Sequence, residues 1–138
     1  MPTPLPDNPH WPPPFLLYLG NAPDELSAKT ARGLVRFRPE WCVGQYRGPE
    51  CRTSVDVPDM DFAQARAAGA RTMIVGVANA GGKFGAETVA DIVAALDAGL
   101  NVASGLHERL TSHPEIVEAA RRNGLHLFDA RVPPATPV

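Results

Sequence analysis

The chain has 138 residues and a mass of 14.7 kDa, which is the size of one globular domain. Its net charge of -2 and its scattered basic residues speak against nucleic-acid binding. No apolar run is long enough to cross a bilayer, and the N-terminus lacks the basic and apolar regions of a secretory signal. The two cysteines do not form a disulfide framework, so we expect a cytoplasmic protein.

Proline marks both ends of the chain. Seven of the 15 prolines fall in the first fourteen residues and three in the last six. Such segments adopt extended conformations outside a packed core. We therefore expect a proline-rich arm over residues 1–14, an ordered domain over 15–131 and a proline-rich linker over 132–138.

Short apolar runs alternate with amphipathic helical patterns along the ordered part. The predicted strands are 15–19, 41–46, 72–77, 100–103 and 125–128, and the predicted helices are about 24–37, 60–68, 86–98 and 114–123. Continuously apolar strands are typical of parallel sheets that are covered on both faces. The pattern predicts a three-layer α/β domain with a five-stranded, mainly parallel sheet, and leaves the strand order open.

Two helices have apolar faces that we expect to point inward. On the first, the stripe includes Leu34 and Phe37. On the last, Ile116, Val117 and Ala120 are predicted to face the core.

Ligands of open parallel sheets bind outside the carboxyl ends of the strands. Small and polar residues follow three predicted strands: Gly20 and Asn21, then Asn79, Gly81, Gly82 and Lys83, then Ser104 and Gly105. Glycine N–H groups can cradle an anion, and Lys83 adds positive charge. The alternative is a sharp turn with a solvated lysine. We predict that these residues line one cleft at one edge of the sheet.

His107, in the loop after the fourth strand, is the candidate catalytic residue because an imidazole performs acid–base chemistry near neutral pH. A structural histidine is the alternative. Asp129 closes the last strand and is expected to reach the same edge; a helix cap and a surface ion pair are the alternatives. The histidines lack the short spacing of a helix-borne metal pair, so no metal site is predicted.

Two nucleotide-binding motifs are absent after the first strand. Lys29 and Thr30 lack the preceding glycine of a Walker A loop, because Ala28 occupies that position. The G-x-G-x-x-G fingerprint of dinucleotide-binding domains is also missing, which weakens an NAD(P) prediction.

Several blocks in a fixed order resemble one bacterial family that is carried as a domain of unknown function. The blocks are 15–30, 38–45, 76–79, 97–107 and 128–131. Some members are labelled NAD-dependent epimerase/dehydratase-like, and one branch acts as D-glutamate N-acetyltransferase. The resemblance covers residues 15–131 and implies a Rossmann-like N-terminal domain, followed in the family by a P-loop NTPase-like domain.

The resemblance implies a ligand-binding domain of a cytoplasmic amino-acid-metabolism enzyme that transfers an acetyl group from acetyl-CoA to D-glutamate. On this reading, acetyl-CoA or another nucleotide-containing ligand binds at the glycine loops, and the chain is inactive without the P-loop domain. The alternatives are an NAD(P)-dependent epimerase/dehydratase-like domain and a non-catalytic module that docks the P-loop domain. A homo-oligomer is left open.

Overall fold

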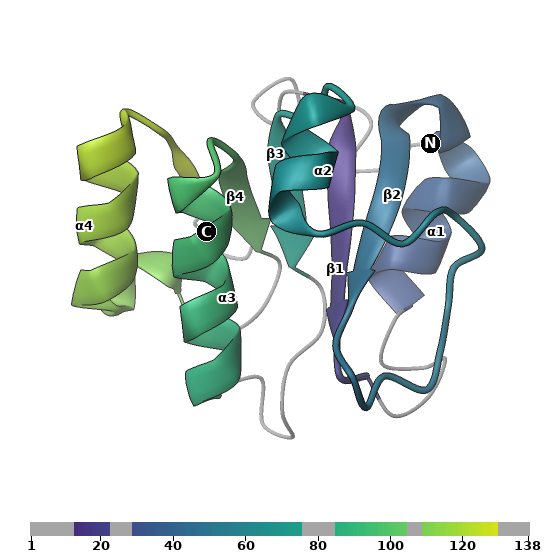
Figure 1. The fold of residues 1–138 in the computed structure, drawn as a ribbon, viewed down its shortest axis with the longest axis horizontal. Coiled ribbons are helices and arrows are strands. Elements are labelled where there is room, and N and C mark those ends of the chain that lie inside the picture. Colours follow the sequence, from purple (N-terminus) through teal and green to yellow (C-terminus); the bar gives the residue numbers. More distant parts are fainter. Residues whose placement is uncertain (1–12, 23–28, 76–84, 105–108, 130–138) are drawn as a thin grey trace, which may run out of the picture.

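The computed structural model describes residues 13–22, 29–75, 85–104 and 109–129. Its centre is a five-stranded sheet in the order β2-β1-β3-β4-β5, and every neighbouring pair is parallel (Figure 1). The strands are β1 (Phe15–Gly20), β2 (Cys42–Arg47), β3 (Thr72–Val75), β4 (Asn101–Ser104) and β5 (Leu127–Asp129). The predicted fold class is confirmed, and the strand order is the flavodoxin-like one.

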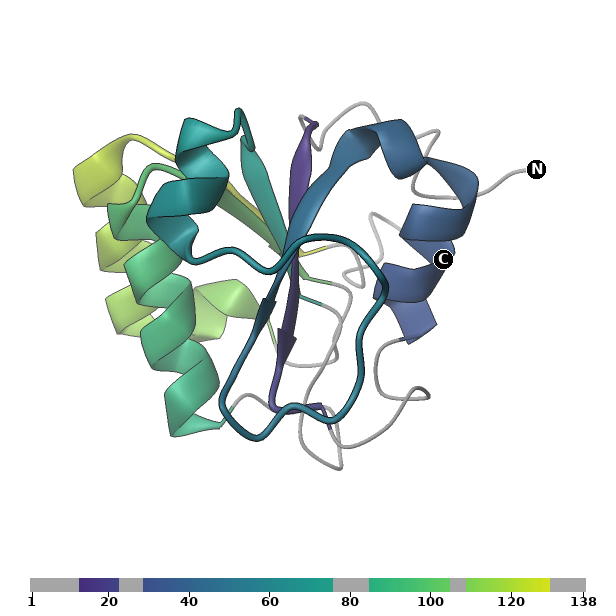
Figure 2. The ribbon, with the colours of Figure 1, turned by 45° about the vertical axis from the view of Figure 1, so that its right-hand side comes forward.

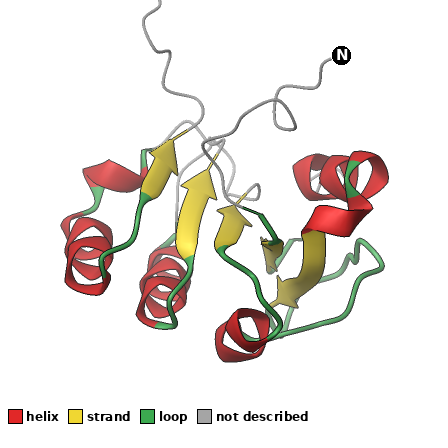
Figure 3. Ribbon diagram, turned by 90° about the horizontal axis from the view of Figure 1, so that it is seen from above, coloured by secondary structure: helices red, strands yellow, loops and turns green. Residues whose placement is uncertain are grey.

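Helices lie on both faces of this sheet. They are α1 (Lys29–Phe37), α2 (Phe62–Ala67), α3 (Ala86–Asp97) and α4 (Pro114–Asn123), with short 3-10 turns η2 (Pro39–Trp41) and η3 (Leu110–Ser112). Seen from above, α2, α3 and α4 cover one face, and α1 lies on the other (Figure 3). In the described parts of the chain, no helix is long and apolar enough to span a membrane.

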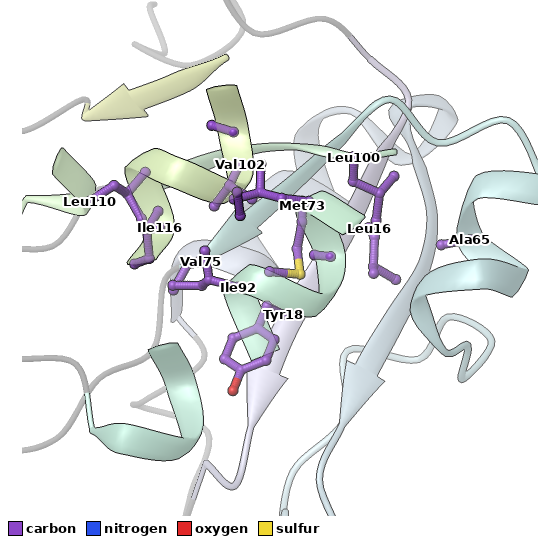
Figure 4. Close-up of a cluster of buried hydrophobic side chains, with 14 of the residues drawn as sticks. Leu16, Tyr18, Ala65, Met73, Val75, Ile92, Leu100, Val102, Leu110 and Ile116 are labelled. Atoms are coloured by element: carbon purple, nitrogen blue, oxygen red, sulfur yellow. The ribbon is translucent and has the colours of Figure 1, made fainter. Parts of the chain in front are cut away.

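The core has one apolar layer on each side of β1, whose six residues are all buried. Leu16 and Met73 pack with Ile92 and Ile116 under α3 and α4 (Figure 4). The next residue along β1, Leu17, packs on the opposite face of the sheet, in the apolar cluster beneath α1. Burial of successive residues on both faces explains why the strand is continuously apolar.

Two predicted inward side chains are exposed instead. Phe37 is 66% exposed, because Ala31 and Leu34 form the buried stripe of α1 and Phe37 is its last residue. Val117 is 39% exposed, since Ile116, Ala119 and Ala120 occupy the inward positions of α4. At about 100° per residue, Ala119 and Ala120 lie on either side of Ile116 around the helix axis and share its inward face, whereas Val117 lies beyond the edge of that face.

The starts of α2 and β5 each lie two residues later than predicted. Asp61 caps α2 by accepting a hydrogen bond from the Gln64 N–H at 2.7 Å, while the Gln64 side chain accepts from the Asp61 N–H at 2.8 Å. This capping box starts α2 at Phe62 rather than Met60. Near the other end of the chain, the Leu125 N–H donates a hydrogen bond to the Ala120 carbonyl of α4, so β5 begins at Leu127 rather than at Leu125.

The segment between β2 and α2 loops back past the outer edge of β2 and then pairs with it in parallel, through a bridge between Gln45 and Asp59 (Figure 2). The Gln45 N–H donates to the Pro58 carbonyl at 2.8 Å, and the Met60 N–H donates to the Gln45 carbonyl at 2.9 Å. Gly44 permits this approach, because a Cβ there would lie 2.8 Å from both the Pro58 carbonyl oxygen and the Met60 sulfur.

Candidate functional site

The carboxyl ends of the parallel strands meet at one edge of the sheet, the lower edge in Figure 1, and we call this the carboxyl edge. Tyr18 is in register with Val75, and Val75 is in register with Ser104, so β1, β3 and β4 end side by side. The chain leaves β1 for β2 on one side and then returns to β3 on the other. This reversal is the switch point at which open α/β sheets bind ligands.

The predicted cleft residues are placed only in part. Gly20 and Ser104 are the last residues of β1 and β4, and Ser104 is fully buried. Asn79, Gly81, Gly82, Lys83, Gly105 and His107 lie outside the described residues. The cleft therefore stays a prediction, although the strands that precede its three loops end at the same edge.

Asn21 links two segments at this edge. Its side-chain carbonyl accepts a hydrogen bond from the Glu50 N–H at 3.0 Å, and its amide nitrogen donates to the Glu87 carboxylate at 3.4 Å. Glu50 follows β2, whereas Glu87 belongs to the first turn of α3. Gly48 is required beside it, because a Cβ there would collide with the Asn21 side chain.

A hollow of about 620 Å³ opens at the carboxyl edge beside Asn21, and we call it the β2 hollow. The described residues that line it are Asn21, Pro49, Glu50, Cys51 and Arg52. Glu50 and Arg52 are exposed, whereas Thr53 and Val55 are buried. Within the described part of the chain, neither the Glu50 carboxylate nor the Arg52 guanidinium has a hydrogen-bonding or ionic partner. Among the described residues, the hollow therefore offers one cation and one anion that have no partner.

Gln45 holds the wall of the β2 hollow in place. Its buried side-chain amide donates to Ser54 Oγ at 3.0 Å, to the Val57 carbonyl at 2.9 Å and to Asp59 Oδ1 at 3.1 Å. Its Oε1 accepts from the Val55 N–H at 2.9 Å. Both the donors and the acceptor of one amide are thus used to fix the chain that follows Arg52.

A tyrosine–aspartate pair lies between β1 and α3. The Tyr18 hydroxyl donates to Asp91 Oδ2 at 2.6 Å, and the Tyr18 ring stacks on Tyr46 with centroids 5.6 Å apart. In Figure 4 the Tyr18 ring extends away from the leucine and valine side chains of its cluster. Burial raises the pKa of the Asp91 carboxyl, the Tyr18 hydrogen bond opposes this, and the Glu87 carboxylate adds to it.

Asp129 has a structural role among the described residues. Its carboxylate accepts a hydrogen bond from the Leu110 N–H at 2.7 Å, at the first residue of η3. Asp129 ends β5 in register with Ser104, so it lies at the carboxyl edge, and its side chain also accepts a hydrogen bond at the start of η3; the structure thus supports both the edge placement and the capping role.

Glu50, Arg52 and Gln45 are absent from the sequence-based site. Residues 48–59 form an irregular segment after β2, and the edge argument that was applied to β1, β3 and β4 applies equally to β2. A search of every strand end would have included Glu50 and Arg52. The polar Gln45 within the predicted strand 41–46, whose other residues are mainly apolar, was the second available signal.

Comparisons with known proteins agree with this architecture. Residues 42–133 match a family model described as a domain of unknown function, DUF1611_N, a Rossmann-like domain. A DUF1611 family protein from Anabaena variabilis has a similar structure, with a TM-score of 0.72 at 21% identity over 91% of this chain and 39% of that one. At this identity the likeness shows the shared fold alone.

Two curated relatives carry the name D-glutamate N-acetyltransferase. The protein from Tritonibacter scottomollicae is 44% identical over 120 residues, and the one from a Pseudoalteromonas species is 36% identical over 121 residues. The matches cover 87% and 88% of this chain but only 36% of each relative, so the chain spans about a third of their length. Because the family model matches most of the chain, the chain belongs to the DUF1611_N family of Rossmann-like domains.

Proposed function

We propose that this chain is the ligand-binding domain of an amino-acid-metabolism enzyme that transfers an acetyl group from acetyl-CoA to D-glutamate. The observation that carries the proposal is the 44% identity to a D-glutamate N-acetyltransferase over nearly the whole domain. The resemblance further implies a P-loop NTPase-like domain as its partner within the same protein. In this proposal the domain is inactive alone and acts in the cytoplasm.

The proposed reaction forms a bond between the glutamate nitrogen and the acetyl carbon and breaks the thioester C–S bond. The substrate ammonium must lose a proton before attack, and coenzyme A leaves as the thiol. His107, which follows β4, is the proposed base for that proton. The glycine loop at 79–83 is the proposed site for the phosphates of acetyl-CoA, next to the switch point between β1 and β3.

A chimaera tests the proposal. The stretch of the Tritonibacter scottomollicae relative that this chain matches is replaced by this chain, and thiol release from acetyl-CoA is measured with D-glutamate. We expect a rate within about tenfold of the unmodified relative, and no release by this chain alone or by the relative without the stretch. Binding of NADH by this chain, together with an inactive chimaera, would instead support the oxidoreductase alternative.

Lys83→Ala tests the glycine loop separately. The lysine ammonium acts as a point charge, so the variant should bind acetyl-CoA more weakly. Salt screens such charges over roughly 10 Å at about 0.1 M. The loss of affinity should therefore be larger at about 20 mM salt than at about 500 mM salt. Titration calorimetry on the chimaera measures both dissociation constants. Equal loss of affinity at the two salt concentrations would show that Lys83 does not meet an anionic group.

A further inference from the structure

We propose that the β2 hollow, lined by Asn21, Pro49, Glu50, Cys51 and Arg52, binds the amino-acid substrate as a zwitterion, with a carboxylate on Arg52 and the ammonium on Glu50. The inference rests on the proposed function and deepens it, because it assigns the amino acid to one place on the domain.

The charges of the hollow fit an amino acid better than a nucleotide. Arg52 supplies a planar guanidinium, which matches a carboxylate through two parallel hydrogen bonds, and Glu50 supplies one negative charge. A phosphate-bearing ligand would meet that negative charge unfavourably, whereas an α-ammonium group is attracted to it. Among the described residues that line the hollow, Glu50 and Arg52 are the only acidic and basic side chains.

The backbone that bears these charges is fixed before any ligand arrives. The Arg52 N–H donates to the Ala22 carbonyl at 2.9 Å, and the Cys51 N–H donates to the Gly48 carbonyl at 3.1 Å. The Asn21 side chain holds the Glu50 N–H, and Gln45 fixes the chain from Ser54 to Asp59. A site on such a preorganised loop does not have to order its backbone on binding, which favours affinity for a small ligand.

The hollow also lies where the proposed reaction needs it. Asn21 lines the hollow and also bonds to Glu87 at the start of α3, the helix that follows the glycine loop. The amino acid in the hollow and a thioester at the switch point between β1 and β3 would thus occupy neighbouring positions along the carboxyl edge.

Two charge-removing variants test the proposal against a matched control. Arg52→Gln and Arg36→Gln each remove one exposed arginine, but Arg36 is in the last turn of α1, which leads to the amino end of β2 at the opposite edge. Binding of D-glutamate to the chain is followed by NMR titration. We expect Arg52→Gln to raise the dissociation constant tenfold or more and Arg36→Gln to leave it within twofold.

Glutarate, which lacks the ammonium group, separates the two charges. Glu50→Gln should weaken D-glutamate binding several-fold and leave glutarate binding unchanged or stronger, whereas Arg52→Gln should weaken both. Absence of D-glutamate binding by the unmodified chain, or equal effects of Arg52→Gln and Arg36→Gln, would overturn the proposal.

The same variants in the chimaera distinguish this proposal from the function on which it rests. Arg52→Gln should raise KM for D-glutamate and leave KM for acetyl-CoA unchanged. If the chimaera is active and Arg52→Gln leaves its KM for D-glutamate unchanged, the proposed binding site in the hollow is rejected but the acetyltransferase assignment is kept. An inactive chimaera, with D-glutamate still bound by the chain through Arg52, would reject the assignment but keep the hollow.

Discussion

Replacing Gln45 by glutamate is expected to lower the free energy of unfolding at pH 7 by about 3 kcal/mol, since each buried polar group left without a partner costs about 1–3 kcal/mol. The glutamate keeps the acceptor for the Val55 N–H but loses the NH2 group that donates to Val57 and Asp59. It also places a second carboxylate beside that of Asp59. Urea denaturation followed by tryptophan fluorescence measures the loss.

Gln64→Glu is the matched control for this variant. Gln64 is exposed and forms half of a capping box in which glutamate serves equally well, so its replacement should change stability by less than about 0.5 kcal/mol. The Gln45→Glu loss should shrink in acid, where the new carboxyl is protonated and again donates a hydrogen bond. An equal effect of the two variants would mean that the Gln45 amide does not hold the loop.

Tyr18→Phe is expected to destabilise the domain by about 1.5–3 kcal/mol at pH 7, the range for a hydrogen bond to a charged group. The substitution removes the donor at 2.6 Å from a partly buried Asp91 carboxylate and leaves the stacked ring in place. Tyr46→Phe is the control, because among the described residues the Tyr46 hydroxyl has no hydrogen-bond partner. In an Asp91→Asn background the Tyr18→Phe loss should fall to about 1 kcal/mol.

The pH dependence of Asp91 gives an independent measurement on the same pair. Burial raises the pKa of Asp91 above the value of about 3.9 in an unfolded chain. This carboxyl therefore stabilises the fold most below pH 4, and the stabilisation is lost as pH rises through the folded pKa. Relative to the unmodified protein, Asp91→Asn should become more stable as pH rises from about 3 to 7.

Asp97→Asn should show the opposite trend. The hydrogen bond from Arg122 lowers the pKa of Asp97, so its contribution is present above about pH 4 and is lost in acid. Parallel trends for Asp91→Asn and Asp97→Asn would contradict the assigned direction for Asp91.

The spacing of apolar residues predicts the described helices and strands because burial of those residues determines which element each segment forms. β1 is apolar throughout since both of its faces are covered, and that signal is local to six residues. The orientations of Phe37 and Val117 depend on where a helix lies against the sheet, which no local pattern contains. Strand order is likewise a long-range property, because each crossover has two sides of the sheet available.

The site was less accessible to sequence reasoning for a related reason. Gly20 ends a strongly apolar strand and Asn21 follows it, so the rule that ligands bind at the carboxyl ends of parallel strands leads to both residues. The Glu50 N–H is held by Asn21, 29 residues earlier, and the Val55 N–H by Gln45, 10 residues earlier, and only folding brings these pairs together. From the sequence, Asp91 is one polar residue on an amphipathic helix, and only the structure shows its hydrogen bond with Tyr18.

The segment along the outer edge of β2 also bears on how the domain meets other molecules. Outer strands normally present free N–H and C=O groups that recruit strands from neighbouring chains, which leads to aggregation. Here the N–H and C=O of Gln45 are already bonded to Pro58 and Met60. A second molecule therefore cannot extend the sheet at β2 without first displacing that segment and breaking the hydrogen bonds of the Gln45 amide.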